Sequence, residues 1–208
     1  MSLYSINHNF CFIRVPRTGS TTVFRAIRKA YEQKQGDFYD MQWEDETMPW
    51  IGGPNNKNLI RTKQIHPPAI QIKEKLKDKW KNIESFGCIR NPWRWFVSVW
   101  ESKHWHDGEY ENFYDFVINK KQTPVDWLID ENKNIIVKHV FKTENINEDL
   151  NNFLSSINQN IVINKKFNEG VYNNPPYEYF VQHPELIDYI ANKCSREIEL
   201  GNYKYDLQ

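Results

Sequence analysis

Little in the sequence points to disulfides, metal clusters or membrane spans. The three cysteines, Cys11, Cys88 and Cys194, are far apart, odd in number and without a CxxC spacing, which argues against a disulfide framework or a zinc site. No apolar run approaches the length of a transmembrane helix. Residues 1–9 also lack the charged-then-apolar pattern of a signal peptide. We therefore expect a soluble, cytoplasmic protein with no membrane segment.

An excess of charge of one sign is also missing. The 27 lysines and arginines balance the 27 aspartates and glutamates, whereas nucleic-acid binders depend on surplus positive charge. We therefore expect no nucleic-acid partner. The 208 residues, 39% of them hydrophobic and 26% charged, fit a single globular domain over residues 1–208. The aromatic share of 15% raises the expectation of a ligand-binding cleft.

Apolar runs and helical periodicities alternate along the chain. Strands are predicted over residues 10–15, 59–65, 85–89 and 135–139, and helices over residues 21–34, 69–80, 93–103, 146–157 and 177–194. This alternation predicts an α/β fold with three layers, in which a central parallel sheet lies between helices. The polar segment 35–58 is interpreted equally well as a lid and as a surface loop.

The first candidate binding segment is VPRTGSTT, residues 15–22, between a predicted strand and a predicted helix. Backbone N–H groups at a helix start, with neighbouring hydroxyls, form a cradle for an anion. Gly19 permits close approach of the backbone, and Arg17 adds a permanent charge. The Walker A pattern is absent, so ATP hydrolysis is not the natural interpretation. The alternative is that the hydroxyl residues only cap the helix.

The second candidate segment begins at Arg90, which ends a buried strand, and Ser98 stands eight positions later. The carboxyl ends of parallel strands face the ligand crevice of α/β folds. Arg90 can bind a phosphate through two N–H groups, and Ser98 can reach the same phosphate from the following helix. The alternative is an ion pair for Arg90 and simple packing for Ser98.

Together the two segments resemble the donor-binding elements of sulfotransferases that use PAPS (3′-phosphoadenosine 5′-phosphosulfate). Residues 15–22 are similar to the 5′-phosphosulfate loop P-K-[ST]-G-[GST]-[ST]-[ST], with Arg17 in place of the usual lysine. Residues 90–98 are similar to the 3′-phosphate element R-N-P-x-x-R/W-x-x-S. The resemblance implies the P-loop NTPase-like sulfotransferase fold and a PAPS site formed by Arg17, Thr18, Gly19, Ser20, Thr21, Thr22, Arg90 and Ser98.

His66 resembles the catalytic histidine of the K-x-H-x-P type segment in that family, with Lys63 three residues before it rather than two. A histidine is a suitable general base near neutral pH. The resemblance implies that His66 takes the acceptor proton while Arg17 stabilises the departing phosphate. An arginine is a poor proton donor, because its pKa exceeds about 12. Lys165 and Lys166 are weaker candidates for the 3′-phosphate.

No metal is expected. His104 and His106 form an H-x-H pattern whose rings would leave a helix on different faces, and the resemblance implies no metal either.

Family analogy and aromatic content favour a carbohydrate hydroxyl as acceptor, ahead of tyrosine or a small metabolite. Two other functions stay open. One is a small-molecule kinase on a P-loop-like fold, which would need Mg²⁺. The other is a non-catalytic nucleotide-binding protein, which Arg17 keeps in consideration.

Overall fold

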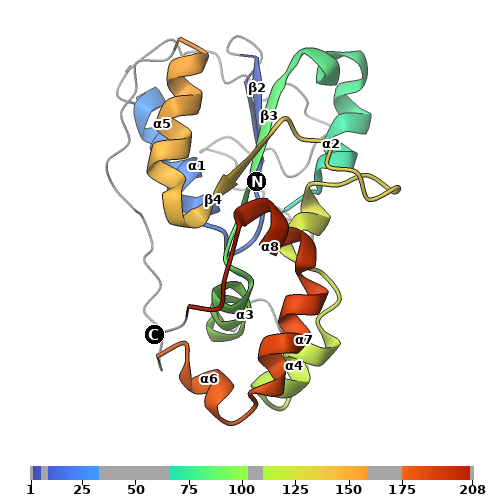
Figure 1. Ribbon diagram of the computed structural model, residues 1–208. Coiled ribbons are helices and arrows are strands. Elements are labelled where there is room, and N and C mark those ends of the chain that lie inside the picture. Colours follow the sequence, from blue (N-terminus) through green and yellow to red (C-terminus); the bar gives the residue numbers. More distant parts are fainter. Residues whose placement is uncertain (1, 6–8, 33–65, 103–109, 159–174, 207–208) are drawn as a thin grey trace, which may run out of the picture.

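The computed structural model describes residues 2–5, 9–32, 66–102, 110–158 and 175–206. Its centre is a sheet of four strands in the order β1 (Leu3–Ser5), β2 (Phe10–Ile13), β3 (Glu84–Ile89) and β4 (His139–Lys142) (Figure 1). Strands β2, β3 and β4 are parallel, which confirms the predicted parallel core. Strand β1 pairs antiparallel with β2 at the edge. Sequence analysis missed β1, because three residues are too few to show a strand periodicity.

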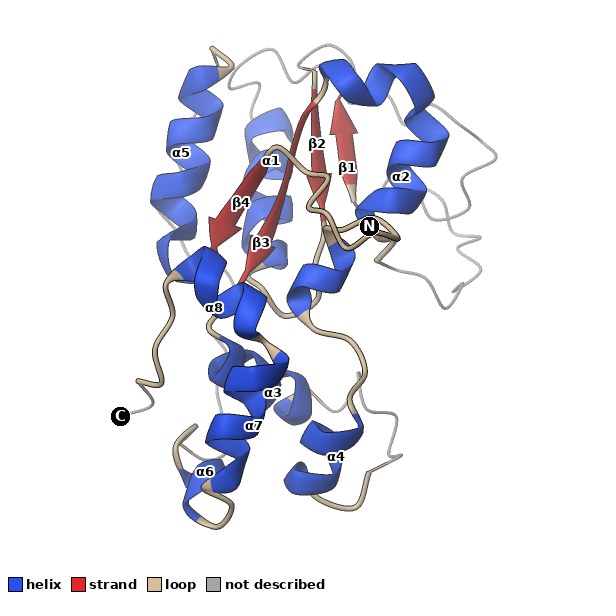
Figure 2. Cartoon of the chain, turned by 45° about the vertical axis from the view of Figure 1, so that its right-hand side comes forward, coloured by secondary structure: helices blue, strands red, loops and turns tan. Residues whose placement is uncertain are grey.

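Helices cover both faces of this sheet, as the three-layer prediction requires (Figures 1 and 2). One face packs against α1 (Ser20–Glu32) and α5 (Ile146–Ser156). The other packs against α2 (Ala69–Leu76) and the 3-10 segments η2 (Lys77–Asn82) and η3 (Pro124–Trp127). All four side chains of β2 are buried. A strand covered on both faces has no polar side, which explains its uninterrupted apolar run.

Phenylalanine rings fill the layer between the sheet and α5. Phe86 of β3 stacks on Phe12 of β2 and on Phe141 of β4, with ring centroids 5.0 and 4.9 Å apart. Phe153 of α5 lies 4.6 Å from the Phe86 ring. Aromatic pairs at such distances add to the hydrophobic stabilisation that burial supplies. These rings join the three parallel strands and α5 in one hydrophobic core.

A second group of helices lies beyond the carboxyl ends of the parallel strands (Figure 1). It contains α3 (Pro92–Glu101), α4 (Phe113–Asn119), α6 (Glu178–Val181) and α7 (Glu185–Lys193), and α8 (Ser195–Gly201) follows α7. Aromatic residues again form its core, among them Trp95, Phe96, Phe116 and Phe180. Much of the high aromatic content therefore serves packing.

Most predicted elements are present with shifted ends, and one strand prediction is wrong. The fourth strand is predicted over residues 135–139, but β4 begins at His139, so the two share only that residue. Ile135 instead forms an isolated bridge with Ile129. Helices α4 and α8 were not predicted. The predicted strand 59–65 and the segment 35–58 lie outside the described residues. In the part of the chain that is described, no helix has the length and apolarity to cross a membrane.

Candidate active site

The loop after β2 reverses the chain at the carboxyl edge of the sheet and leads into α1. Arg17 and Gly19 adopt left-handed backbone conformations, with φ of 61° and 70°. A Cβ on Gly19 would lie 3.1 Å from Ile146 Cδ1 and 3.2 Å from Thr143 Cγ2. Gly19 therefore serves both the turn and the close packing of the loop on the start of α5.

The hydroxyl residues of the loop divide into two groups. Thr18 is buried and donates to the Val15 carbonyl at 3.1 Å, so its hydroxyl shapes the loop. Ser20, Thr21 and Thr22 lie in the first turn of α1. The Thr22 N–H donates to the Gly19 carbonyl at 2.8 Å. The predicted anion cradle thus has the expected strand, turn and helix start.

The second segment follows β3 at the same edge of the sheet. Arg90 comes directly after the strand, and Asn91 caps α3 by accepting from the Arg94 N–H at 3.3 Å. Pro92 occupies the first helical position, where its missing N–H has no cost. Ser98 lies further along α3 and is buried. Asn91 and Pro92 therefore fix the direction in which α3 leaves the sheet.

The fold joins the two candidate segments directly. The Arg17 Nε–H donates to Ser98 Oγ at 3.0 Å, and the Arg90 Nη1–H donates to the Arg17 carbonyl at 3.1 Å. The Trp95 indole N–H donates to the Pro16 carbonyl at 2.9 Å. The family resemblance implies that Arg17 and Ser98 contact different phosphates of one nucleotide. In the structure these two side chains are hydrogen-bonded to each other.

His66 lies at the carboxyl end of β2. Its Nδ1–H donates to the Arg14 carbonyl at 2.7 Å, which leaves Nε2 as the acceptor nitrogen of a neutral ring. Burial lowers the pKa of His66 to about 3, against the opposing effect of this hydrogen bond. The indole N–H of Trp127 donates to the His66 carbonyl at 3.0 Å, so η3 helps to hold the segment. His66 is neutral at physiological pH.

Arg14 is a residue of this site that sequence analysis missed. Its Nη2–H donates to Thr21 Oγ1 at 3.2 Å, and its guanidinium lies 5.4 Å from the Phe24 ring centroid. Its Nε is buried and makes no hydrogen bond within the described residues. Burial and the nearby Arg25 lower the pKa of Arg14. The only signal in the sequence was a charge inside an otherwise apolar strand pattern.

Contacts around Glu144 tie the ends of β3 and β4 together. The Asn91 N–H donates to Glu144 Oε1 at 3.0 Å, and the Tyr203 hydroxyl donates to Glu144 Oε2 at 2.8 Å. The Thr143 hydroxyl donates to the Ile89 carbonyl at 2.9 Å. Burial, with the charge of Glu144, raises the pKa of Tyr203, so its hydroxyl stays a donor. Thr143–Asn145 form the 3-10 segment η4, which connects β4 to α5.

Among the described residues, the remaining candidates add no further site. Within the described ranges, no three His, Cys, Asp or Glu residues are grouped so that they could hold a metal ion. Trp93 and Trp95 belong to the buried core of the helical group. Lys63, His104, His106, Lys165 and Lys166 lie outside the described residues.

A glycine-containing loop between a parallel strand and a helix, faced by arginines, is typical of α/β proteins that bind phosphorylated nucleotides. The model of the sulfotransferase family matches residues 2–170, a range that includes both segments and His66. The chain therefore belongs to the sulfotransferase family and is a transferase of sulfuryl groups. Searches of curated proteins and of solved structures gave no significant match.

Proposed function

We propose that the protein transfers a sulfuryl group from PAPS to a hydroxyl of its acceptor, and that this acceptor is a carbohydrate. The observation that carries the donor assignment is the contact between the two candidate segments. Arg17, Arg90 and Ser98 meet at one point of the carboxyl edge. A donor with two separate anionic groups needs two such elements side by side.

The residues present fit this donor. The left-handed turn at Arg17 and Gly19 directs the chain into the start of α1, where backbone N–H groups attract an anion. Arg17 and residues 18–22 would hold the 5′-phosphosulfate. Arg90 and Ser98 would hold the 3′-phosphate, because a guanidinium and a hydroxyl together supply several donors to phosphate oxygens.

In the proposed reaction the acceptor oxygen forms a bond to sulfur while the bond between sulfur and the bridging phosphate oxygen breaks. The electron pair of that bond leaves on the 5′-phosphate, where Arg17 and the loop N–H groups stabilise the charge. His66 Nε2 takes the acceptor proton. The hydrogen bond from Nδ1 to the Arg14 carbonyl supports this role, because it fixes the ring and its tautomer.

Because Ser98 accepts from Arg17, the two phosphate contacts of the proposed site are coupled. Ser98 Oγ accepts from the Arg17 Nε–H and can at the same time donate its own proton to a 3′-phosphate oxygen, so one hydroxyl would link the cation and the phosphate. The proposed consequence is that donor binding at one end alters the freedom of the cation at the other end. This coupling would favour a donor that carries both anionic groups.

The carbohydrate acceptor rests on the family analogy. The aromatic content supports it less than the sequence suggests, since many rings belong to the two buried cores. Arg14 stands near His66 and Thr21 and would lie at the acceptor side of the loop.

The first experiment is calorimetric titration with PAP, the desulfated product, and with ATP and ADP as controls, all without added metal. Tight binding of PAP with much weaker binding of ATP and ADP supports the donor assignment. Preference for ATP that depends on Mg²⁺ would indicate a kinase instead.

Transfer of labelled sulfate from PAPS to a panel of sugars, tyrosine peptides and small alcohols then tests the acceptor. PAP binding without turnover on the whole panel would favour a non-catalytic nucleotide-binding protein.

A further inference from the structure

The segment after α8 folds back across the start of α3. We call residues Tyr203–Asp206 the C-terminal strap. A left-handed residue, Asn202 with φ of 49°, turns the chain, and a Cβ on Gly201 would lie 2.1 Å from the Tyr203 ring. In Figure 1 the chain then runs from α8 down past α3. The Asn91 side-chain N–H donates to the Lys204 carbonyl at 3.0 Å, which fixes the strap at the cap of α3.

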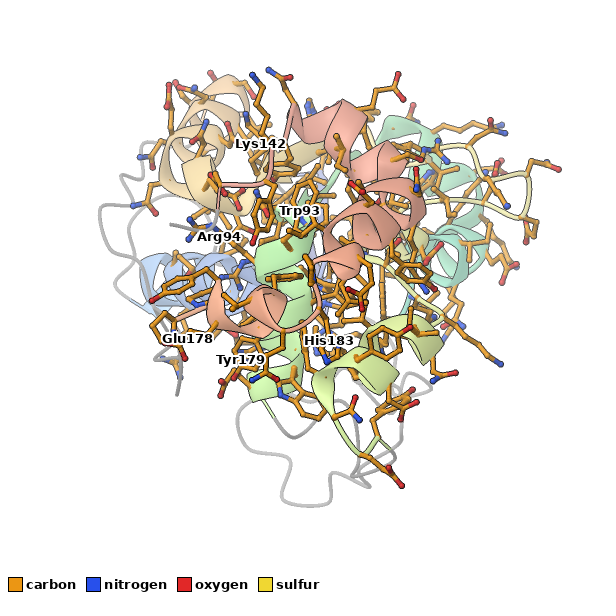
Figure 3. All side chains as sticks on the ribbon, turned by 60° about the horizontal axis from the view of Figure 1, so that its bottom comes forward. Trp93, Arg94, Lys142, Glu178, Tyr179 and His183 are labelled. Carbon is orange, nitrogen blue, oxygen red and sulfur yellow. The ribbon has the colours of Figure 1, made fainter. Side chains whose placement is uncertain are left out.

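The last described residue of the strap places a carboxylate on Arg94. Asp206 Oδ1 lies 3.5 Å from Arg94 Nε and accepts from Asn91 Nδ2 at 3.2 Å. The Arg94 Nη2–H also donates to the Asp206 carbonyl at 3.3 Å. Figure 3 shows Arg94 beside Trp93 at the start of α3. The side chains are 36% and 63% exposed, so the pair lies in contact with solvent.

Arg94 stands on the same side of α3 as Ser98. The two residues are four positions apart, which places their side chains one above the other on a helix. Ser98 accepts from Arg17, and Arg90 donates to the Arg17 carbonyl. The face of α3 that the loop approaches therefore carries Ser98 with Arg94 one turn nearer the strand end.

We propose that Arg94 is a further contact for the 3′-phosphate of the donor, and that the Asp206 carboxylate is the internal anion which this phosphate replaces. The proposal rests on the proposed function. An exposed ion pair contributes little to stability, whereas a phosphate offers several charged oxygens to a guanidinium. Exchange of Asp206 for the phosphate is therefore favourable. Arg94 would bind the 3′-phosphate, the group that distinguishes PAP from AMP.

The test compares the dissociation constants of PAP and AMP, two ligands that differ only in the 3′-phosphate. We expect Arg94→Gln to weaken PAP binding roughly tenfold, the loss of one charge-assisted phosphate contact, and to change AMP binding less than about twofold. We expect Asp206→Asn to tighten PAP binding by about two- to fivefold, because it removes a weak competitor, and to leave AMP unchanged. In the Arg94→Gln background, Asp206→Asn should have no further effect.

Glu199→Gln is the matched control, because it removes one exposed carboxylate from α8 close in sequence to the strap. It should leave both ligands unchanged, and melting temperatures confirm that each variant is folded. Weaker PAP binding in Asp206→Asn would overturn the proposal and assign the strap to positioning α3. Equal losses of PAP and AMP in Arg94→Gln would also overturn it. If the unaltered protein prefers neither PAP over AMP nor PAP over ATP, it is the proposed function that fails, a result distinct from these two.

Discussion

The charged side chains at the two edges of the parallel sheet have different hydrogen-bond partners. At the amino edge, Glu84 begins β3 and receives Lys138 Nζ at 2.6 Å and His139 Nε2 at 2.8 Å. At the carboxyl edge, Arg14, Arg17 and Arg90 donate to a threonine hydroxyl, a serine hydroxyl and a backbone carbonyl. At one edge a carboxylate accepts from a lysine and a histidine, whereas at the other edge these three hydrogen bonds of the arginines go to neutral oxygens.

This difference locates the anion-binding end of the molecule. A guanidinium bonded to a neutral oxygen keeps its full charge for an incoming anion. A carboxylate that already accepts from Lys138 and His139 offers an incoming anion little attraction. The zero net charge of the chain hides this contrast, because composition does not report where charges lie. At the carboxyl edge, Arg94 is paired with the Asp206 carboxylate. This is the carboxylate that we propose the 3′-phosphate of the donor replaces.

The largest effect is expected for His66→Asn. Asparagine can still donate to the Arg14 carbonyl but cannot take a proton, so turnover should fall by roughly 10²- to 10⁴-fold. PAP affinity should stay within about threefold, because the charge of the donor site is unchanged. Single-turnover sulfate transfer and calorimetry measure the two quantities. A variant that keeps most of its turnover would remove His66 from the role of base.

The pH dependence of kcat/KM sharpens the same prediction. Since burial lowers the pKa of His66 to about 3 in the free protein, the active neutral form persists well below pH 6.5. The contribution of this group to stability is complete above its unfolded pKa of about 6.5 and declines as the pH falls toward 3. We expect kcat/KM to be flat from pH 8 to about 5.5. An acid limb centred near pH 6.5 would mean that the imidazole is solvated during catalysis.

Arg90→Ala is expected to have the next largest effect. It removes one charged partner of the proposed 3′-phosphate, and PAP affinity should fall about 100-fold, or ~2.7 kcal/mol. Arg196→Ala, an arginine of α8 whose described hydrogen bond goes to the Lys133 carbonyl, is the control and should bind PAP normally. Undiminished PAP binding by Arg90→Ala would contradict the conclusion that the carboxyl edge binds the anions of the donor.

A smaller effect is expected for Arg17→Lys. The charge is kept, so PAP affinity should change by less than about tenfold although the Nε–H bond to Ser98 is lost. A lysine, with an ordinary pKa of about 10.4, is a better proton donor than arginine, so turnover should rise about two- to tenfold. Initial rates at saturating PAPS provide the measurement. A fall in turnover would show that the contact with Ser98 matters more than proton donation.

The smallest effect is expected at the opposite edge. Glu84→Gln should cost about 0.5 kcal/mol of unfolding free energy at pH 7, since the pair with Lys138 is partly exposed. The hydrogen bond from Lys138 lowers the pKa of Glu84, so this contribution exists above about pH 4.5 and is lost as the pH falls further. Urea unfolding at pH 7 and pH 3 tests it. Any change in PAP affinity would contradict the separation of the two edges.

Sequence analysis predicted the elements whose signal is local. The run from Phe10 through Gly19 into α1 shows a strand, a turn and a helix within a few residues, and each depends on neighbouring side chains. The same holds for Arg90, Pro92 and α3. The fourth strand was misplaced, because Ile135–Val137 is more apolar than the residues that pair with β3. There a long-range ladder overrode local propensity.

By itself the sequence determined the α/β class, the two loop segments and the family, because these depend on residue types at fixed short spacings. Only the tertiary structure decided that Arg17 would meet Ser98, that Arg14 would join the loop, and that Asp206 would pair with Arg94. The physical reason is that these contacts depend on which strands pair and in which register. The parallel pairing of Ile13 with Gly87 brings the ends of β2 and β3 side by side, and no local pattern specifies which distant strands will pair.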